Sequence, residues 1–235
     1  MENDSEVAPQ ITVVHSSDLH LLAAGRGDDL HSLREVIAAV NAAGADVLLL
    51  AGDVFDHNRL PLALVDAASR LLGDLAARVV ILPGNHDCLT AGSVYRRGGI
   101  GEVPNVEVLG LTVDNRLCLD ALDLEIWGQP HLDHVDMSPL AGAGPRRKRY
   151  QISVAHGHWV TGPHDDHRSW LIHDEEIAAL DSDYLALGHW DRAVQLHESP
   201  VPAYYSGSPD LARTINLIQL SAAGTQVSRV PLSRE

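Results

Sequence analysis

Cysteine and long apolar runs are scarce in this sequence of 235 residues. The two cysteines, Cys88 and Cys118, lack the Cys-x-x-Cys spacing of many metal and redox sites, and two thiols cannot build a disulfide framework. We therefore expect a reduced, cytoplasmic compartment. No apolar run approaches the roughly 18 residues that a membrane-spanning helix needs, so we expect no contact with a membrane.

Basic residues are also few. Lys148 is the sole lysine, and 17 basic residues face 32 acidic ones, which gives a formal net charge of −15. Such a surface repels a long polyanion, so the composition argues against an extended groove for duplex DNA. The one basic run, over residues 141–149, is interpreted as a solvated surface loop, with phosphate or nucleic-acid contact as the alternative. A small phosphorylated substrate fits this charge balance better.

The remaining composition is that of a globular domain. Hydrophobic residues make up 45% of the chain and charged residues 21%, which is ordinary for a chain that folds around one large core. The segment 1–10 is acidic and is predicted to be a disordered tail. We expect a single domain over residues 11–235.

The first third of the chain predicts alternating strands and helices. Short, strongly apolar runs suited to buried strands cover Ile11–Ser16, Asp46–Ala51 and Arg78–Leu82. Apolar residues at helical spacing lie between them, over Leu30–Ala43 and Leu62–Ala76. This βαβαβ order predicts parallel pairing with right-handed crossovers.

The rest of the chain predicts mostly short strands separated by turn residues. One short helix is expected at Glu175–Leu180. The expected strands are Val106–Leu109, Thr112–Asp114, Leu117–Leu119, Leu124–Gly128, Tyr150–Ala155, Tyr184–Leu187, Val194–His197, Ala203–Tyr205, Thr214–Leu220 and Gln226–Val230.

Acidic and histidine residues follow several of these strands directly. The residues concerned are Asp18, His20, Asp53, Asp56, Asn85, His86, His156, His189 and Asp191. Ligands in open α/β sheets collect outside the carboxyl ends of strands, so these side chains can converge. Carboxylates, imidazoles and one amide could hold two divalent metals, which hydrolyse phosphate esters by generating hydroxide and neutralising charge. Any one motif alone could equally be a capped turn.

Taken in order, these motifs resemble the calcineurin-like metallophosphoesterases, whose signatures are D-x-H, G-D-x-x-D, G-N-H-[DE], H and G-H-x-H. The resemblance extends from Ile11 to about Val230. Within that family the chain is most similar to the SbcD-type nuclease branch, through the phrases at residues 15–20, 49–56, 82–87, 126–130 and 205–209. The resemblance implies an α/β fold, a four-layer αββα sandwich with mixed sheets.

The resemblance also implies roles for individual residues. The metal ligands would be Asp18 and His20 on the first ion, Asp53 bridging both, and Asn85, His156 and His189 on the second. His86 would stabilise the phosphate or protonate the leaving oxygen, and Asp56 would orient His86. His158 and His57 could touch the substrate, with supporting hydrogen bonds or pocket lining as alternatives. His131 and His134 are expected to face solvent.

The last signature departs from the family pattern, because Asp191 stands where a histidine is usual. The resemblance implies that this position completes the shell of the first ion, and we expect Asp191 to be a metal ligand there. A carboxylate favours Mn²⁺ or Mg²⁺ over metals that prefer imidazole. The alternatives are ligation through water or a weak first site. We expect two divalent ions, with Mn²⁺ favoured over Mg²⁺, Fe or Zn²⁺.

These observations predict a metal-dependent phosphoesterase in which two metal ions hold a bridging hydroxide, and phosphodiesters are the preferred substrates. The expected partner is a phosphorylated small molecule or a short or single-stranded nucleic acid. Alternatives are a phosphomonoesterase, a nucleotide pyrophosphatase or a non-catalytic protein that kept the fold. The sequence allows an oligomer, with a homodimer as the simplest form.

Overall fold

The computed structural model describes residues 10–23, 29–161, 168–198 and 200–233. Residues 1–9 of the expected tail lie outside these ranges, so its predicted disorder stays a prediction. None of the helices in the described ranges combines the length and apolar character that a membrane span requires.

The first sheet is built around four parallel strands, of which the βαβαβ pattern predicts the first three. β13 joins it antiparallel to β1, and β14 forms the edge beyond β13. The strands of this sheet, in spatial order, are β14 (Gly224–Pro231), β13 (Thr214–Ser221), β1 (Ile11–Ser16), β2 (Val47–Ala51), β3 (Arg78–Leu82) and β4 (Val106–Val108).

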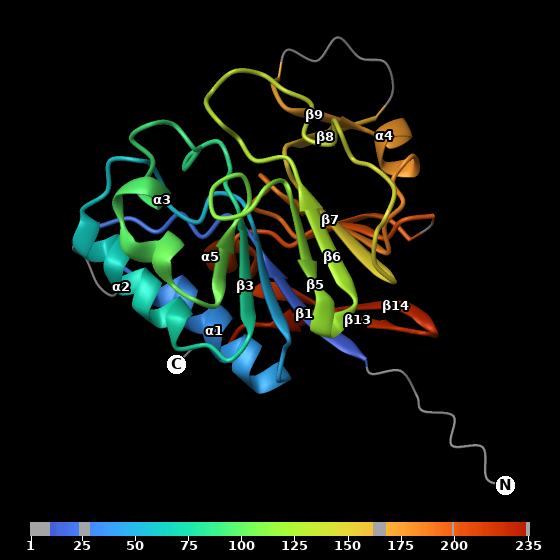
Figure 1. The fold of residues 1–235 in the computed structure, drawn as a ribbon, viewed down its shortest axis with the longest axis horizontal. Coiled ribbons are helices and arrows are strands. Elements are labelled where there is room, and N and C mark those ends of the chain that lie inside the picture. The colour runs from blue at the N-terminus through green and yellow to red at the C-terminus, as the bar shows by residue number, and fades with distance from the viewer. Residues whose placement is uncertain (1–9, 24–28, 162–167, 199, 234–235) are drawn as a thin grey trace, which may run out of the picture.

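Two helices cover the outer face of this sheet, α1 (His31–Ala43) and α2 (Leu62–Gly73) (Figure 1). In α1 the side chains of Leu33, Val36 and Val40 recur at helical spacing and are fully buried. The helix ends at Gly44, whose left-handed φ of 56° lets its N–H bond back to the last turn.

The second sheet is also mixed. Its strands, in spatial order, are β11 (Val194–His197), β12 (Ala203–Tyr205), β10 (Tyr184–Gly188), β7 (Tyr150–His156), β6 (Leu124–Gly128) and β5 (Arg116–Leu119). β12, β10, β7 and β6 run parallel, and an antiparallel strand closes each edge.

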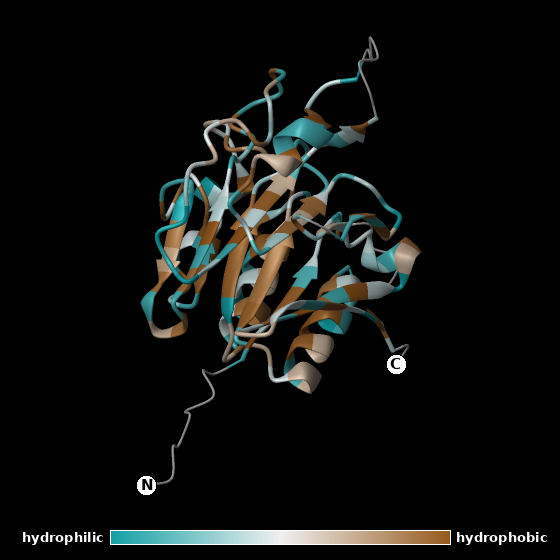
Figure 2. Ribbon diagram, turned by 90° about the vertical axis from the view of Figure 1, so that its right-hand side faces the viewer, coloured by the Kyte–Doolittle hydropathy of each residue, from teal (hydrophilic) through white to brown (hydrophobic). Residues whose placement is uncertain are grey.

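The two sheets pack face to face, and buried apolar clusters separate four layers. One cluster fills the space between the first sheet and its helices, and a second lies between the two sheets. A third lies outside the second sheet, under α4 (Asp174–Ala178) and the small sheet of β8 (His158–Val160) and β9 (Leu171–His173). Figure 2 shows the hydrophobic strands in the middle of the molecule. The predicted αββα sandwich with mixed sheets is confirmed.

Departures from the predicted elements involve short segments. Residues 112–114 form no strand, and only an isolated bridge joins Leu109 to Val113. The sequence did not predict α3 (Val94–Arg97), α5 (Pro209–Ala212), β8 or β9. Elements of three or four residues are too short for a recognisable periodicity.

Candidate metal centre

Most of the predicted metal ligands meet at one rim of the sandwich, where strands of both sheets end. Asp18 and His20 follow β1, Asp53 follows β2, and Asn85 follows β3. From the second sheet, His156 is the last residue of β7 and His189 follows β10. Parallel β1–β2–β3 and parallel β7–β10 place these five chain segments at the same end of their sheets.

The backbone at this rim is bent sharply. Among the described residues, four candidate ligands have positive φ: Asp18 (53°), His20 (46°), Asp53 (52°) and His189 (102°). Side chains rarely adopt this conformation, and such strain concentrates at functional sites. The chain therefore turns sharply after β1, β2 and β10, where these four candidate ligands lie.

The Asp53 carboxylate lies at the centre of the donor groups. Its Oδ2 is 3.2 Å from His156 Nε2 and 3.9 Å from His20 Nε2, and its Oδ1 accepts the His86 N–H at 2.9 Å. Asp53 belongs to two groups of close donor atoms, one with Asp18 and His20 and one with His156 and His189. This arrangement suits a carboxylate shared by two cations.

The remaining ligand candidates are held by backbone contacts. The Asp18 carboxylate accepts the backbone N–H of His189 at 3.0 Å. The carbonyl oxygen of Ala51 lies 2.9 Å from His156 Nδ1, which directs Nε2 toward Asp53 and toward the Asn85 Oδ1, 3.0 Å away. Hydrogen bonds of this kind fix the tautomer of a ligating histidine.

Glycines let the two sheets approach closely here. A Cβ atom at Gly52 would lie 2.0 Å from His156 Nδ1, and one at Gly188 would lie 1.8 Å from the Ala51 carbonyl oxygen. Gly52 also has a φ of 91°. Only glycine allows this contact between the end of β2 and the end of β7.

His86 differs from the ligand candidates because it is exposed. Its ring packs edge-on against His20 at 4.7 Å, and its Nδ1 contacts the backbone carbonyl oxygen of Asp56 at 2.8 Å. The Asp56 carboxylate instead lies 3.4 Å from His20 Nδ1. The sequence predicts that the Asp56 carboxylate orients His86, whereas in the structure the backbone oxygen of Asp56 makes that contact and the carboxylate faces His20. Donor atoms of His20, Asp56 and His86 still lie close together, as a third group of possible ligands.

Burial and opposite charges dominate the electrostatics of the site. Burial raises the pKa of Asp18. Burial alone would lower the pKa of His156, but the Asp53 carboxylate raises it to about 9. Burial alone would raise the pKa of Asp53, but His156 lowers it. Burial lowers the pKa of His189 to about 3, so this imidazole stays neutral and can ligate.

The residues present fit divalent metal ions. Asp18 and Asp53 are each only 2% exposed, and buried carboxylates that lie so close together need a positive partner. His20 Nδ1 is a buried nitrogen that makes no hydrogen bond among the described residues, although the Asp56 carboxylate lies 3.4 Å away. Oxygen and imidazole donors together suit Mn²⁺, Fe or Zn²⁺ better than an all-oxygen site would.

Three predicted site residues lie outside these donor groups in the described chain. Asp191 is exposed and lines a separate groove beside Arg192 and Arg229. His158 accepts from the Trp190 indole at 3.1 Å, and its ring lies 5.8 Å from that of His189. His57 accepts the Arg59 N–H at 3.2 Å. Ligation by Asp191 and substrate contact by the two histidines stay predictions.

Sequence reasoning missed two supporting residues. His131 was expected to face solvent, but it is 1% exposed and its Nε2 contacts the His156 carbonyl oxygen at 2.8 Å. Its position just after β6, at the same rim, was the available signal. Asp87 is fully buried and accepts from Gly84 N–H (2.7 Å), Phe55 N–H (3.1 Å) and the Tyr95 hydroxyl (2.6 Å). It fixes the turn that presents Asn85 and His86.

A two-sheet α/β sandwich that carries a histidine and carboxylate cluster at its rim defines a class of metal-binding hydrolases. A family model for calcineurin-like phosphoesterases matches residues 11–220. The chain therefore belongs to the calcineurin-like phosphoesterase family. A search of curated proteins finds no significant match.

Solved structures share the fold at low sequence identity. The protein TT1561 of Thermus thermophilus is 12% identical with a TM-score of 0.63, over 94% of this chain and 99% of that one. An archaeal phosphodiesterase is 15% identical with a TM-score of 0.50, over 94% and 100%. A putative 5'-nucleotidase from Staphylococcus aureus, in complex with alpha-ketoglutarate, is 14% identical with a TM-score of 0.64, over 97% of this chain and 55% of that one.

Proposed function

We propose that this protein hydrolyses phosphodiesters with two divalent cations, Mn²⁺ foremost, held at the rim. The observation that carries the proposal is the position of Asp53, whose carboxylate belongs to both groups of donor atoms. The ligands would be Asp18, His20, Asp53, Asn85, His156 and His189. When bound, the cations would acidify a water molecule and neutralise charge on the phosphate.

The protein's own residues would orient and protonate the substrate. His86 is exposed and shares a group of close donor atoms with His20 and Asp56 but not with Asp53. The Asp56 carbonyl oxygen fixes its Nδ1, so its Nε2 is directed away from that contact. A protonated His86 could donate from Nε2 to a phosphate oxygen or to the leaving oxygen. Asp53 supports this position because it accepts the His86 backbone N–H.

The charge of the protein and its resemblances favour a small phosphodiester substrate. A net charge of −15 opposes tight contact with long duplex DNA, whereas a phosphorylated small molecule or a short single strand needs few contacts beyond the cations. The resemblance to the SbcD-type branch, and the fold shared with a phosphodiesterase, favour diesters. The fold shared with a putative 5'-nucleotidase keeps monoesters as the second candidate.

Comparison of two chromogenic substrates tests the proposal. With Mn²⁺ added, we expect faster turnover of bis-p-nitrophenyl phosphate than of p-nitrophenyl phosphate. The Asp53→Asn variant is the matched control, because it removes the shared charge and changes the volume little. Faster monoester turnover would favour the second candidate. Turnover of both substrates no greater than in Asp53→Asn would indicate a non-catalytic protein that kept the fold.

A further inference from the structure

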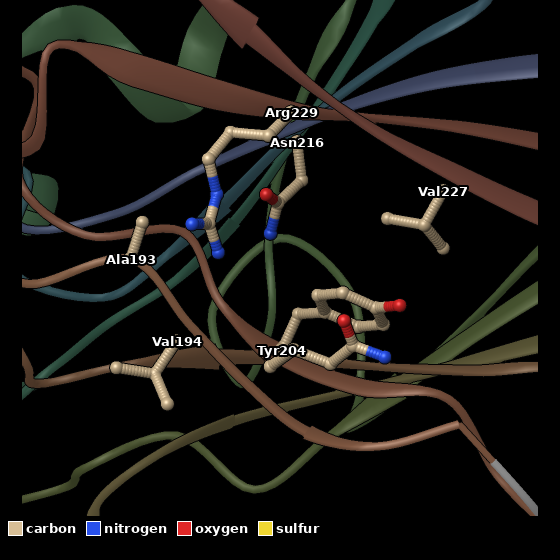
Figure 3. Close-up of a pocket in the computed structure, with 7 residues that line it drawn as sticks. Ala193, Val194, Tyr204, Asn216, Val227 and Arg229 are labelled. Atoms are coloured by element: carbon tan, nitrogen blue, oxygen red, sulfur yellow. The ribbon is translucent and has the colours of Figure 1, made fainter.

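A groove opens where the β11–β12 edge of the second sheet faces the β13–β14 edge of the first (Figure 3). It has a volume of about 490 Å³. Its lining includes Val194, Gln195, Tyr204, Asn216, Val227 and Arg229. A second hollow of about 530 Å³ shares Arg229 and adds Arg192 and Thr214.

Polar side chains on one face of the first sheet form the floor of the groove. Thr214 and Asn216 alternate along β13, and Asn216 is directly opposite Arg229 on β14, so all three share a face. Figure 3 shows the Asn216 amide and the Arg229 guanidinium pointing into the space above Tyr204.

Two polar atoms of this floor lack partners among the described residues. Asn216 is 1% exposed; its Nδ2 donates to the Tyr184 hydroxyl at 3.2 Å and lies 3.5 Å from His15 Nδ1, but its Oδ1 makes no hydrogen bond. The hydroxyl oxygen of Thr214 is likewise buried without a partner. Buried polar groups are nearly always satisfied in folded proteins, so these atoms indicate room for a ligand or water.

Arg229 is the one charged side chain among the described residues that line the groove. In the second hollow, Arg192 and Arg229 contribute two guanidinium groups against one carboxylate from Asp191. Glu198 also lies near this region, because its charge and that of Arg229 both act on the Tyr204 phenol. Its carboxylate accepts a hydrogen bond from the Gln195 amide at 3.0 Å and has no proton to donate to an anion. Guanidinium groups bind phosphate and carboxylate in a bidentate manner.

The opposite side of the groove offers a surface for a ring. Tyr204 is half-buried, and its ring stacks on that of Tyr184 at 5.8 Å with an interplanar angle of 25°. Val194 and Val227 add apolar surface next to it. A preformed aromatic wall with a few convergent polar groups is typical of small-molecule sites.

We propose that this groove binds a small aromatic anion, with its ring against Tyr204 and its phosphate or carboxylate on Arg229. The volume lies within the ordinary range for small-molecule sites, roughly 300–1,000 Å³. The site does not depend on the proposed hydrolysis. Its occupant would lie against the segment 191–193, which continues directly from the candidate ligand His189.

Isothermal titration calorimetry on the metal-loaded full chain tests this site with two probes, 5'-AMP and 4-hydroxybenzoate, which carry a ring with a phosphate or a carboxylate. We expect at least one probe to bind, and Arg229→Gln to weaken it about tenfold because one charged hydrogen-bond donor is lost. Arg147→Gln removes the same charge from an exposed position outside the groove and should leave the affinity unchanged.

Further variants separate the groove from the metal centre. The Arg229-dependent binding should persist in Asp53→Asn, and Tyr204→Leu should weaken the aromatic probe but not inorganic phosphate. Thermal melting checks that each variant is folded. The proposal is overturned if neither probe binds at low-millimolar concentration, if Arg229→Gln and Arg147→Gln bind alike, or if Asp53→Asn abolishes the Arg229-dependent binding.

Discussion

The Asp53 side chain shows how one residue organises the candidate metal centre. Its carboxylate accepts the His86 N–H, contacts His156 and faces His20. The positive φ of Asp53 is adopted by few non-glycine residues, and the strain is compensated by these contacts. Both ligand groups and the exposed His86 therefore depend on the same side chain.

Replacement of His86 by alanine should separate catalysis from metal binding. The His86 ring is exposed and contacts a backbone oxygen rather than a buried carboxylate. We expect His86→Ala to lower turnover of bis-p-nitrophenyl phosphate by about 100-fold or more, the effect of losing one group that stabilises or protonates the transition state. Metal content, measured by native mass spectrometry, should stay at the wild-type level.

Asn85→Ala is the neighbouring control, because Asn85 Oδ1 lies 3.0 Å from His156 Nε2 within the donor set. This variant should lose metal and activity together. If His86→Ala loses metal as well, the division between a ligand and an acid is wrong.

Asp191→Ala tests the residue that departs from the family signature. The Asp191 carboxylate is exposed beside Arg192 and Arg229, outside the donor groups of the described chain. If Asp191 completes the shell of the first ion, directly or through water, as the family signature implies, Asp191→Ala should lose metal in native mass spectra, as Asp18→Ala should. Wild-type occupancy in Asp191→Ala would show that this carboxylate does not reach the metal.

At the scale of elements, the ends of β2 and β7 meet without space for a side chain. Gly52→Ala would place a Cβ 2.0 Å from His156 Nδ1, in a backbone conformation that alanine rarely adopts. We expect this variant to lose metal and about 3 kcal/mol of unfolding free energy, since overpacking and backbone strain add. Metal analysis and urea unfolding measure both effects.

Gly44→Ala is the matched control for Gly52→Ala. Gly44 also has a positive φ, 56°, but a Cβ there would meet no atom within 4 Å. It should cost about 1 kcal/mol, the penalty of the left-handed conformation alone, and leave metal content unchanged. Equal effects of the two variants would contradict the proposed role of close packing at the rim.

The predictability of the elements follows from their length and composition. Val47–Ala51 and Arg78–Leu82 are apolar enough that burial on both faces is their one stable environment, so strands and parallel pairing could be predicted. The donor residues follow such strands, which made their convergence predictable as well. The β8–β9 pair could not be predicted, because its two three-residue strands depend on tertiary contacts.

The sequence predicts which residues form the site better than it predicts which of their atoms are in contact. His131 is buried and contacts His156 and Trp170, which lie far from it in the sequence, so no local pattern encodes its burial. Likewise, the sequence names Asp56 but does not say whether its carboxylate or its backbone oxygen reaches His86. Such choices are made by turn geometry, which involves strained φ values at neighbouring residues.

At the scale of the whole molecule, one buried polar network joins the two sheets. His15 of β1 and Asn216 of β13 contact the hydroxyl of Tyr184 on β10, at 3.0 Å and 3.2 Å. His15 and Tyr184 are completely buried, and Asn216 nearly so. The network thus fixes how the sheets sit on each other, at the cost of burying a titratable ring between them.

Burial lowers the pKa of His15 from 6.5 to about 3, so stability should depend on pH through this residue. Between these two values the unfolded chain binds a proton that the folded protein does not, so stability is full above pH 6.5 and falls as the pH decreases. From pH 7.5 to pH 5 the loss through His15 is about 2 kcal/mol. Urea unfolding of wild type and His15→Gln, both metal-free in the same buffers, measures it.

The glutamine keeps an amide for the Tyr184 hydroxyl but does not titrate. The variant can be less stable than wild type at every pH, but only the change of its unfolding free energy with pH is compared. All other titrating groups are common to the two proteins, and their contributions cancel in the difference. We expect the unfolding free energy of His15→Gln to fall less than that of wild type between pH 7.5 and pH 5. Parallel pH profiles would mean that the folded protein accepts a proton on His15, which requires the two sheets to admit water or separate at that point.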